Sequence, residues 1–327
     1  MRQATLRLFG LLLVAAGAAG TALAQPYPYK PIRIIVPYPP GSGTEFTARE
    51  VAQLFTKALG QQVVIDTRPG AGATLGQALA AKSAPDGYTL LLATAGGLST
   101  GPALMGSKIP YDPLKDFAPI GLATYVPYAL AVTSGLQARN VKELVDLAKA
   151  APGKLNVASP GVGTPNHLGA AQLMTLTGIE LVHVPYKGST LALTDVIAGN
   201  VQMVVTGLLQ LLPYHQAGKL RILGVGHMQR VKAYPDIPAI NESIPGYYNT
   251  GWWGIAGPAA LPKPIIDKLS AIMMAGLTQP DVAQRFERNG LEVASSTPQG
   301  LRDLIESDLN LWKKIIRDAR ISVDVLP

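Results

Sequence analysis

Cysteine is absent from this chain of 327 residues. That absence excludes a disulfide framework, a thiol nucleophile and an acylated cysteine as a lipid anchor. Histidine is scarce too: His167, His183, His215 and His227 are the four, and none is paired at metal-ligand spacing. We therefore expect neither a metal site nor a cofactor.

The chain also lacks an apolar run long enough to cross a bilayer, which takes about 20 residues. Residues 8–20 are apolar, follow Arg2 and Arg7, and precede Ala22-Leu23-Ala24, which fits the small-residue cleavage rule. Residues 1–24 are thus predicted to be a secretory signal peptide cleaved after Ala24, with the mature chain in the bacterial periplasm. A retained N-terminal anchor is the alternative.

Charge is sparse and scattered. Charged residues make up 15% of the chain against 48% hydrophobic residues, as in globular proteins, and the net charge is +7. No dense basic stripe with interleaved aromatic residues occurs, so nucleic-acid binding is not expected. The mild positive charge favours anionic small molecules instead.

What the sequence does contain is a recurring unit: a short buried strand, a turn of Gly, Pro, Ser and Thr, and a capped helix. The unit appears at residues 34–59, 63–82, 88–104, 155–178 and 181–199. Strands that alternate with helices predict an α/β fold with largely parallel sheets. Residues 120–132 and 220–225 are predicted to be crossover segments between two lobes.

The first of these units holds the most distinctive turn, Gly41-Ser42-Gly43-Thr44-Glu45. Its glycines permit positive φ and close approach of a ligand, and Thr44 is a candidate helix cap. The free N–H groups of a helix start favour an anion. Because ligands of open α/β sheets bind beyond the carboxyl ends of strands, several such turns are expected to converge on one crevice. A plain structural turn is the alternative.

Catalytic motifs are mostly missing. Phe46 stands where a dinucleotide fingerprint needs its third glycine, and no Walker sequence occurs. Gly97-Leu98-Ser99-Thr100-Gly101 matches the nucleophile-elbow pattern, but Ser99 lies five residues past Thr94 at the strand end. A serine hydrolase that uses Ser99 is therefore a minor alternative, and we expect no enzyme.

Several motifs in one order carry a family resemblance: YKPIRIIVP (residues 29–37), PPG (39–41), RPGAG (68–72), PDGYTLL (85–91), PYDP (110–113), DFAP (116–119), HVPYKG (183–188), AGKLR (217–221) and PGY (245–247). On these the chain resembles the Bug-type, TctC-like periplasmic solute-binding proteins of tripartite tricarboxylate transporters. The resemblance covers essentially the whole mature chain.

The resemblance implies a two-lobed periplasmic-binding-protein fold of type II, the Venus-flytrap type, with two crossover strands. Lobe I would comprise residues 25–126 and 229–327, and lobe II residues 127–228. The protein would be a monomer that captures a small carboxylate between its lobes and delivers it to the integral-membrane subunits of a transporter. A ligand sensor for a membrane signalling partner would share the fold.

The resemblance also implies the ligand contacts. Lobe I would supply Tyr38, Gly41, Ser42, Gly43, Thr44, Glu45, Thr94, Ala95 and Gly96, and lobe II Ser159, Gly163, Thr164, His167, Tyr186, Lys187, Gly188, Thr206 and Gly207. Trp252 and Trp253 are expected to pack in the core or hinge.

This sequence departs from the family pattern at three places. Ser42 interrupts a usual run of glycines, Glu45 replaces a usual aspartate, and Val205-Thr206-Gly207 replaces a common Phe-Asp-Asn-like sequence. Thr206 cannot pair with an ammonium group as an acid can. We therefore expect a di- or tricarboxylate or an aromatic acid without an amino group.

Overall fold

The computed structural model describes residues 26–318 and residue 321. The predicted signal peptide therefore lies outside the described residues. Within them, no helix is both long enough and apolar enough to span a bilayer.

The strands form one continuous sheet, in the order β2-β1-β3-β9-β4-β7-β5-β6, with β8 and β10 also paired to β4. Their bounds are β1 (Ile32–Val36), β2 (Val63–Thr67), β3 (Thr89–Thr94), β4 (Phe117–Thr133), β5 (Leu155–Ser159), β6 (Leu181–Pro185), β7 (Met203–Gly207), β8 (Leu220–Val225), β9 (Thr250–Pro258) and β10 (Glu292–Val293). The pairs of β1 with β2 and β3, and of β5 with β6 and β7, are parallel, as predicted for an α/β fold.

The helices that cover this sheet are α2 (Gly43–Leu59), α3 (Thr74–Ala81), α4 (Gly101–Met105), α5 (Val141–Ala150), α6 (Pro165–Thr177), α7 (Ser189–Ala198), α8 (Leu208–Gln216), α9 (Lys263–Leu277), α10 (Pro280–Arg288) and α11 (Pro298–Asp318). Short turns η1 (Ala71–Ala73), η2 (Gly96–Thr100), η3 (Gly106–Lys108) and η4 (Ile240–Glu242) link them. The helix α2 ends before Gly60, whose φ of 67° is the left-handed conformation that glycine favours. Its predicted cap is wrong by two residues, because the helix starts after Ser42.

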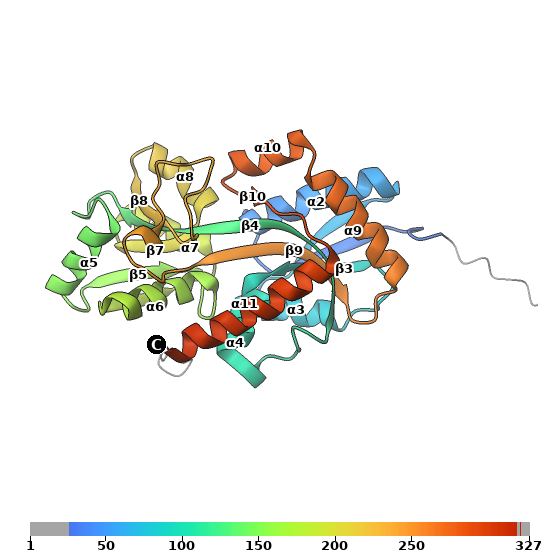
Figure 1. Ribbon diagram of the computed structural model, residues 1–327, viewed down its shortest axis with the longest axis horizontal. Helices are drawn as coiled ribbons and strands as arrows, with labels where there is room; N and C mark the ends of the chain where they lie inside the picture. The colour runs from blue at the N-terminus through green and yellow to red at the C-terminus, as the bar shows by residue number, and fades with distance from the viewer. Residues whose placement is uncertain (1–25, 319–320, 322–327) are drawn as a thin grey trace, which may run out of the picture.

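Two lobes divide the sheet (Figure 1). We call lobe I the part with β1, β2, β3, β9, β10 and the first half of β4, and lobe II the part with β5 to β8 and the second half of β4. β4 joins them: it pairs with β9 up to Pro127, with β7 from Tyr128 and with β8 from Ala129. The two-lobed fold is as predicted.

The second crossing differs from the prediction. The sequence places it at residues 220–225, but these form β8, which pairs with Ala129–Thr133 of β4 inside lobe II. The chain returns instead through β9, whose Thr250 pairs with Pro127. Residues before it still pack on lobe II, since the Asn249 N–H donates to Gly226 O and the Tyr248 N–H to Gln172 of α6. We propose accordingly that the second part of lobe I begins near Thr250, not at residue 229.

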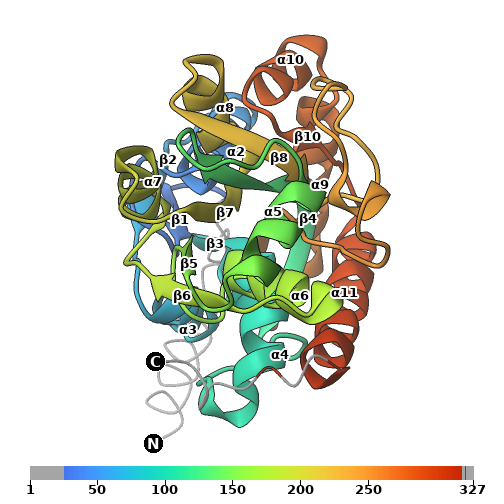
Figure 2. The same ribbon diagram turned by 90° about the vertical axis from the view of Figure 1, so that its left-hand side faces the viewer.

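Strand alternation explains how lobe II is covered on both faces. Leu130 and Val132 of β4 pack in one apolar cluster with residues of α5, whereas Ala129 and Ala131 pack in another with residues of α7 and α8. Successive side chains of a strand point to opposite faces, so a continuous apolar run needs helices on both. Figure 2, seen from the lobe II end, has α5 and α6 in front.

Candidate ligand-binding cleft

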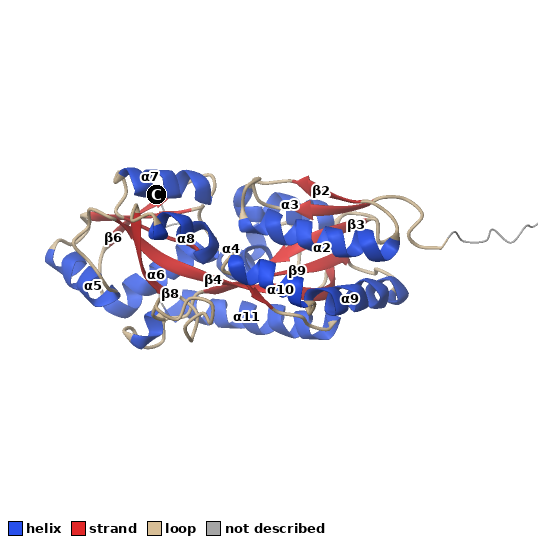
Figure 3. Cartoon of the chain, turned by 90° about the horizontal axis from the view of Figure 1, so that it is seen from above, coloured by secondary structure: helices blue, strands red, loops and turns tan. Residues whose placement is uncertain are grey.

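A cavity of about 790 Å³ lies between the two lobes. Lobe I lines it with the turns after β1 and β2 and with Trp253 of β9, and lobe II lines it with the turns after β5, β6 and β7. These turns follow the carboxyl ends of strands, which is where the sequence predicts a crevice. In Figure 3, α3 of lobe I and α7 of lobe II lie on opposite sides of the gap between the lobes.

Four helices begin at this cavity, and each contributes two or more residues of its cap or first turn to the cavity lining. They are α2, α6, α7 and α8, and the lining residues at their starts are Ser42, Gly43, Thr44, Thr164, Asn166, Gly188, Ser189, Thr190, Gly207, Leu209 and Gln210. The first N–H groups of a helix have no partner within the helix, and its dipole is positive there. Helix starts from both lobes thus direct N–H groups and positive potential toward one space.

Lys187 is the single charged residue among those that line the cavity, and none of them is an acid. Glu45, a predicted contact, is not a lining residue. Its carboxylate accepts the Gly41 N–H at 2.7 Å and pairs with Arg49, and these contacts lower the pKa of Glu45. The Glu45 charge is therefore engaged at the outer side of the turn.

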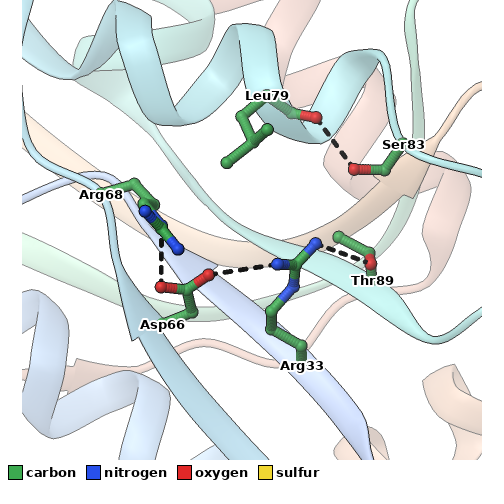
Figure 4. Close-up of polar contacts among 6 residues, drawn as sticks. All are labelled: Arg33, Asp66, Arg68, Leu79, Ser83 and Thr89. Atoms are coloured by element: carbon green, nitrogen blue, oxygen red, sulfur yellow. Dashed lines mark hydrogen bonds and ion pairs between the residues drawn. The ribbon is translucent and has the colours of Figure 1, made fainter.

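Arginine is also kept out of the cavity. Arg68 donates to Asp66 at 2.9 Å, and Arg33 donates to the other oxygen of Asp66 at 3.3 Å and to Thr89 at 3.2 Å (Figure 4). This cluster lies on β1, β2 and β3 of lobe I. The positive end of the cleft is consequently built from helix starts and Lys187, without a guanidinium fork.

The predicted contacts divide into two groups. Those that line the cavity are Tyr38, Ser42, Gly43, Thr44, Thr164, Tyr186, Lys187, Gly188, Thr206 and Gly207. Those that do not are Gly41, Glu45, Thr94, Ala95, Gly96, Ser159, Gly163 and His167. Apart from Gly41 and Glu45, the second group is buried behind the wall.

Tyr38 explains why the turn after β3 does not line the cavity. A Cβ at Gly96 would clash with the Tyr38 hydroxyl and lie 3.4 Å from Pro165, so both residues cover Gly96. Tyr38 itself lines the cavity. Thr94, which forms a hydrogen bond with the Tyr38 side chain, and Gly96 thus lie behind Tyr38, and Tyr38 stands between them and the cavity.

His167 and His183 form a stacked pair behind the lobe II wall. Their ring centroids lie 4.3 Å apart, the Gly163 N–H donates to His167 Nδ1, and His183 Nε2 lies 2.7 Å from Ser159 Oγ. Burial lowers the pKa of His167 to about 3, helped by His183, and burial lowers the pKa of His183 to about 4. The pair is therefore neutral and supports the turn after β5.

Because this pair is neutral in the folded protein, we expect the protein to become less stable as the pH falls. An unfolded histidine binds a proton near pH 6.5, but the folded pair does not until pH falls to about 4 and about 3. The free energy of unfolding should fall between pH 6.5 and 4, by up to about 1.4 kcal/mol per pH unit per histidine. Urea denaturation of His183→Gln and the parent at pH 7, 6 and 5 checks this. Identical pH slopes for the two proteins would contradict it.

The elbow-like Ser99 is not placed as a nucleophile. It lies in η2, is 0% exposed, and faces the buried Asp308 carboxyl of α11. An elbow serine must be exposed at the top of the sheet. Among residues 26–318, no group of three or more His, Cys, Asp or Glu could hold a metal ion.

Sequence reasoning missed several lining residues, among them Asn166, Ser189, Gln210, Tyr128 and Trp253. Trp253 was predicted only to pack in the core or hinge. Their available signal was position: each stands in the first turn of a helix after a strand end, or on a crossing strand.

A cleft between two lobes joined by crossing strands defines the class of two-lobed periplasmic binding proteins. The family model of the tripartite tricarboxylate transporter family receptor, TctC, matches residues 47–321. The chain belongs to this family.

Relatives agree with this assignment. BugT of Bordetella pertussis is 32% identical over 315 residues, 96% of each chain. The structure of R. palustris Rpa4515 with adipate has a TM-score of 0.87 and 30% identity, and covers 90% of this chain and 99% of its own. MatC of Rhodopseudomonas palustris with bound malate has a TM-score of 0.83 and 28% identity, and covers 89% of this chain and 100% of its own.

Proposed function

We propose that this protein captures a small carboxylate in the interlobe cleft and delivers it to a tripartite tricarboxylate-type membrane transporter. One observation carries the proposal: four helix starts from both lobes surround a cavity whose lining has one cation and no acid. Such a lining favours an anion and offers nothing to neutralise a cation. The adipate and malate of the two R. palustris structures are ligands of that chemistry.

The ligand in this proposal has no amino group. An ammonium group needs an acid or several acceptors in a buried site, because an unpaired buried charge is costly. Thr206 and Gly207 line the wall where the family commonly has an acidic residue, and none of the lining residues is an acid.

Ligand binding in this proposal stabilises the closed form. The lobes already approach closely: a Cβ at Gly188 would lie 3.6 Å from Pro39, and one at Gly72 would lie 3.3 Å from Val162 O. A ligand that touches helix starts of both lobes has contacts in the closed form that the open form lacks, so it shifts the equilibrium toward closure.

The proposed setting is the periplasm, with the chain processed after Ala24 and acting as a monomer. The closed, loaded form would dock on the membrane subunits of the transporter, and no chemistry on the ligand is needed. The family is a family of receptors.

A thermal-shift panel tests this function. The mature protein is refolded to remove carried-over ligand and heated with di- and tricarboxylates, aromatic acids, amino acids, sugars and cations. We expect carboxylates alone to raise the melting temperature, since ligand at 100 times Kd adds about 2.7 kcal/mol to stability. Stabilisation by a sugar, a cation or an α-amino acid, with none by any carboxylate that lacks an amino group, would overturn the proposal.

A further inference from the structure

Gln210 connects two hydroxyl groups of the lobe II wall. The Thr206 hydroxyl donates to Gln210 Oε1 at 2.9 Å, and Gln210 Nε2 donates to Ser189 Oγ at 2.8 Å. All three residues line the cavity, and they come from the end of β7, the first turn of α8 and the first residue of α7. The amide therefore joins the starts of two helices that face the ligand.

This chain of hydrogen bonds gives the two hydroxyls opposite roles. A hydroxyl has one proton to donate and two lone pairs to accept with. The Thr206 hydroxyl donates its proton in the hydrogen bond to Gln210 Oε1, so toward the cavity it can only accept a hydrogen bond. Ser189 Oγ accepts a hydrogen bond from Gln210 Nε2, so its own hydroxyl proton is free to donate to another group.

The surroundings of the two hydroxyls match these roles. Ser189 begins α7 and stands two residues after Lys187, where helix N–H groups and a cation favour a carboxylate. Thr206 is 1% exposed, and no acid or cation stands beside it in the lining. Thr206 Oγ1 donates to Gln210 and accepts no hydrogen bond from any described residue, so a ligand hydroxyl could donate to it.

We propose that Gln210 is a specificity-determining residue: through Ser189 and Thr206 it makes the cleft prefer carboxylates that also carry a hydroxyl group over their deoxy analogues. Ser189 would donate to the ligand carboxylate, and Thr206 would accept from the ligand hydroxyl. The inference rests on the proposed function, because it assumes that a carboxylate occupies this cleft.

Calorimetric titration of the refolded protein with matched pairs tests it: malate with succinate, lactate with propionate, and mandelate with phenylacetate. At least one hydroxy acid should bind about tenfold more tightly than its deoxy partner, the worth of one hydrogen bond. Thr206→Val, which keeps the shape and removes the acceptor, should bring that ratio close to one. Ser189→Ala should weaken both members of the pair equally.

Two further variants separate specificity from a structural role. In Gln210→Glu a carboxylate would accept from both hydroxyls and turn the Ser189 proton away from the ligand, so both acids of a pair should bind more weakly. Gln216→Met at the exposed far end of α8 is the control for Gln210→Met. Gln210→Met should lose the hydroxyl preference, and the control should keep it.

The outcomes distinguish this inference from the proposed function. If carboxylates bind but hydroxy and deoxy acids bind equally, or if Thr206→Val leaves the preference intact, the inference is wrong and the function stands. If Gln210→Met lowers only the melting temperature, Gln210 is merely structural and the inference is wrong. If no carboxylate binds, both the inference and the function are wrong.

Discussion

Replacing Gly43 by alanine is expected to weaken carboxylate binding about 10- to 100-fold, the equivalent of the 1–3 kcal/mol that overpacking costs. A Cβ at Gly43 would lie 2.7 Å from Trp253 Cη2 and 3.2 Å from Leu209 Cδ2. Trp253 belongs to β9 of lobe I and Leu209 to α8 of lobe II, so the added methyl pushes against both walls of the cleft. The closed form, which we propose holds the ligand, should suffer most.

Gly207→Ala is the matched control. Gly207 also lines the cavity at a helix start, but a Cβ there would meet only Val126, at an ordinary 3.9 Å. Its affinity for any carboxylate found in the thermal-shift panel should change far less than that of Gly43→Ala. Calorimetry on both variants measures this, with circular dichroism to verify folding. Equal affinities for the two variants would refute the role given to the Gly43 contact.

Replacing Trp252 by alanine is expected to lower the free energy of unfolding by about 3–5 kcal/mol. Trp252 is 2% exposed, and its indole N–H donates to Asp308 Oδ2 at 2.9 Å, which ties β9 to α11. Burial raises the pKa of Asp308 to about 6, while the hydrogen bond from Trp252 acts in the opposite direction. The variant therefore leaves a cavity and removes a donor from a buried carboxyl.

Trp252→Phe separates the two effects. It keeps most of the ring volume and removes the N–H, so it should lower the free energy of unfolding by less than Trp252→Ala does. Because Asp308 loses a donor that favours its charged form, the cost should shrink as pH falls below about 6 and the carboxyl is protonated. Urea denaturation of both variants and the parent at pH 8 and pH 5 measures the effect of the lost ring volume and that of the lost N–H donor. A cost for Trp252→Phe that is the same at the two pH values would argue against the Asp308 contact.

The fold could be predicted closely because its signals are local. The buried strands, the helix stop at Gly60 and the caps Asn140 and Thr164, whose side chains accept from Glu143 N and His167 N, all depend on residues a few positions apart. The second strand that crosses between the lobes could not be predicted from such local signals. β8 and β9 are both short apolar strands, and only their pairing with different halves of β4 decides which one returns to lobe I.

The cleft was harder to predict because a turn's sequence does not say how deep it lies. The turn at Thr94 looks like the one at Ser42, yet Tyr38 covers it, and only packing between distant segments decides this. Glu45 was expected to face the ligand, but the Gly41 N–H and Arg49 hold it outside. The position of Gln210 in the first turn of a helix could place it near the cleft, but its role depends on contacts with Thr206 and Ser189 that the sequence does not show.

We propose that the N–H groups at helix starts of both lobes bind the charge of a carboxylate. Titration calorimetry on the refolded mature protein tests it most directly, with each carboxylate of the panel paired with its uncharged amide, such as adipate with adipamide. We expect at least one carboxylate to bind and its amide, of nearly the same shape, to bind at least about 100-fold more weakly. Equal binding of acid and amide, or tighter binding of the amide, would contradict it.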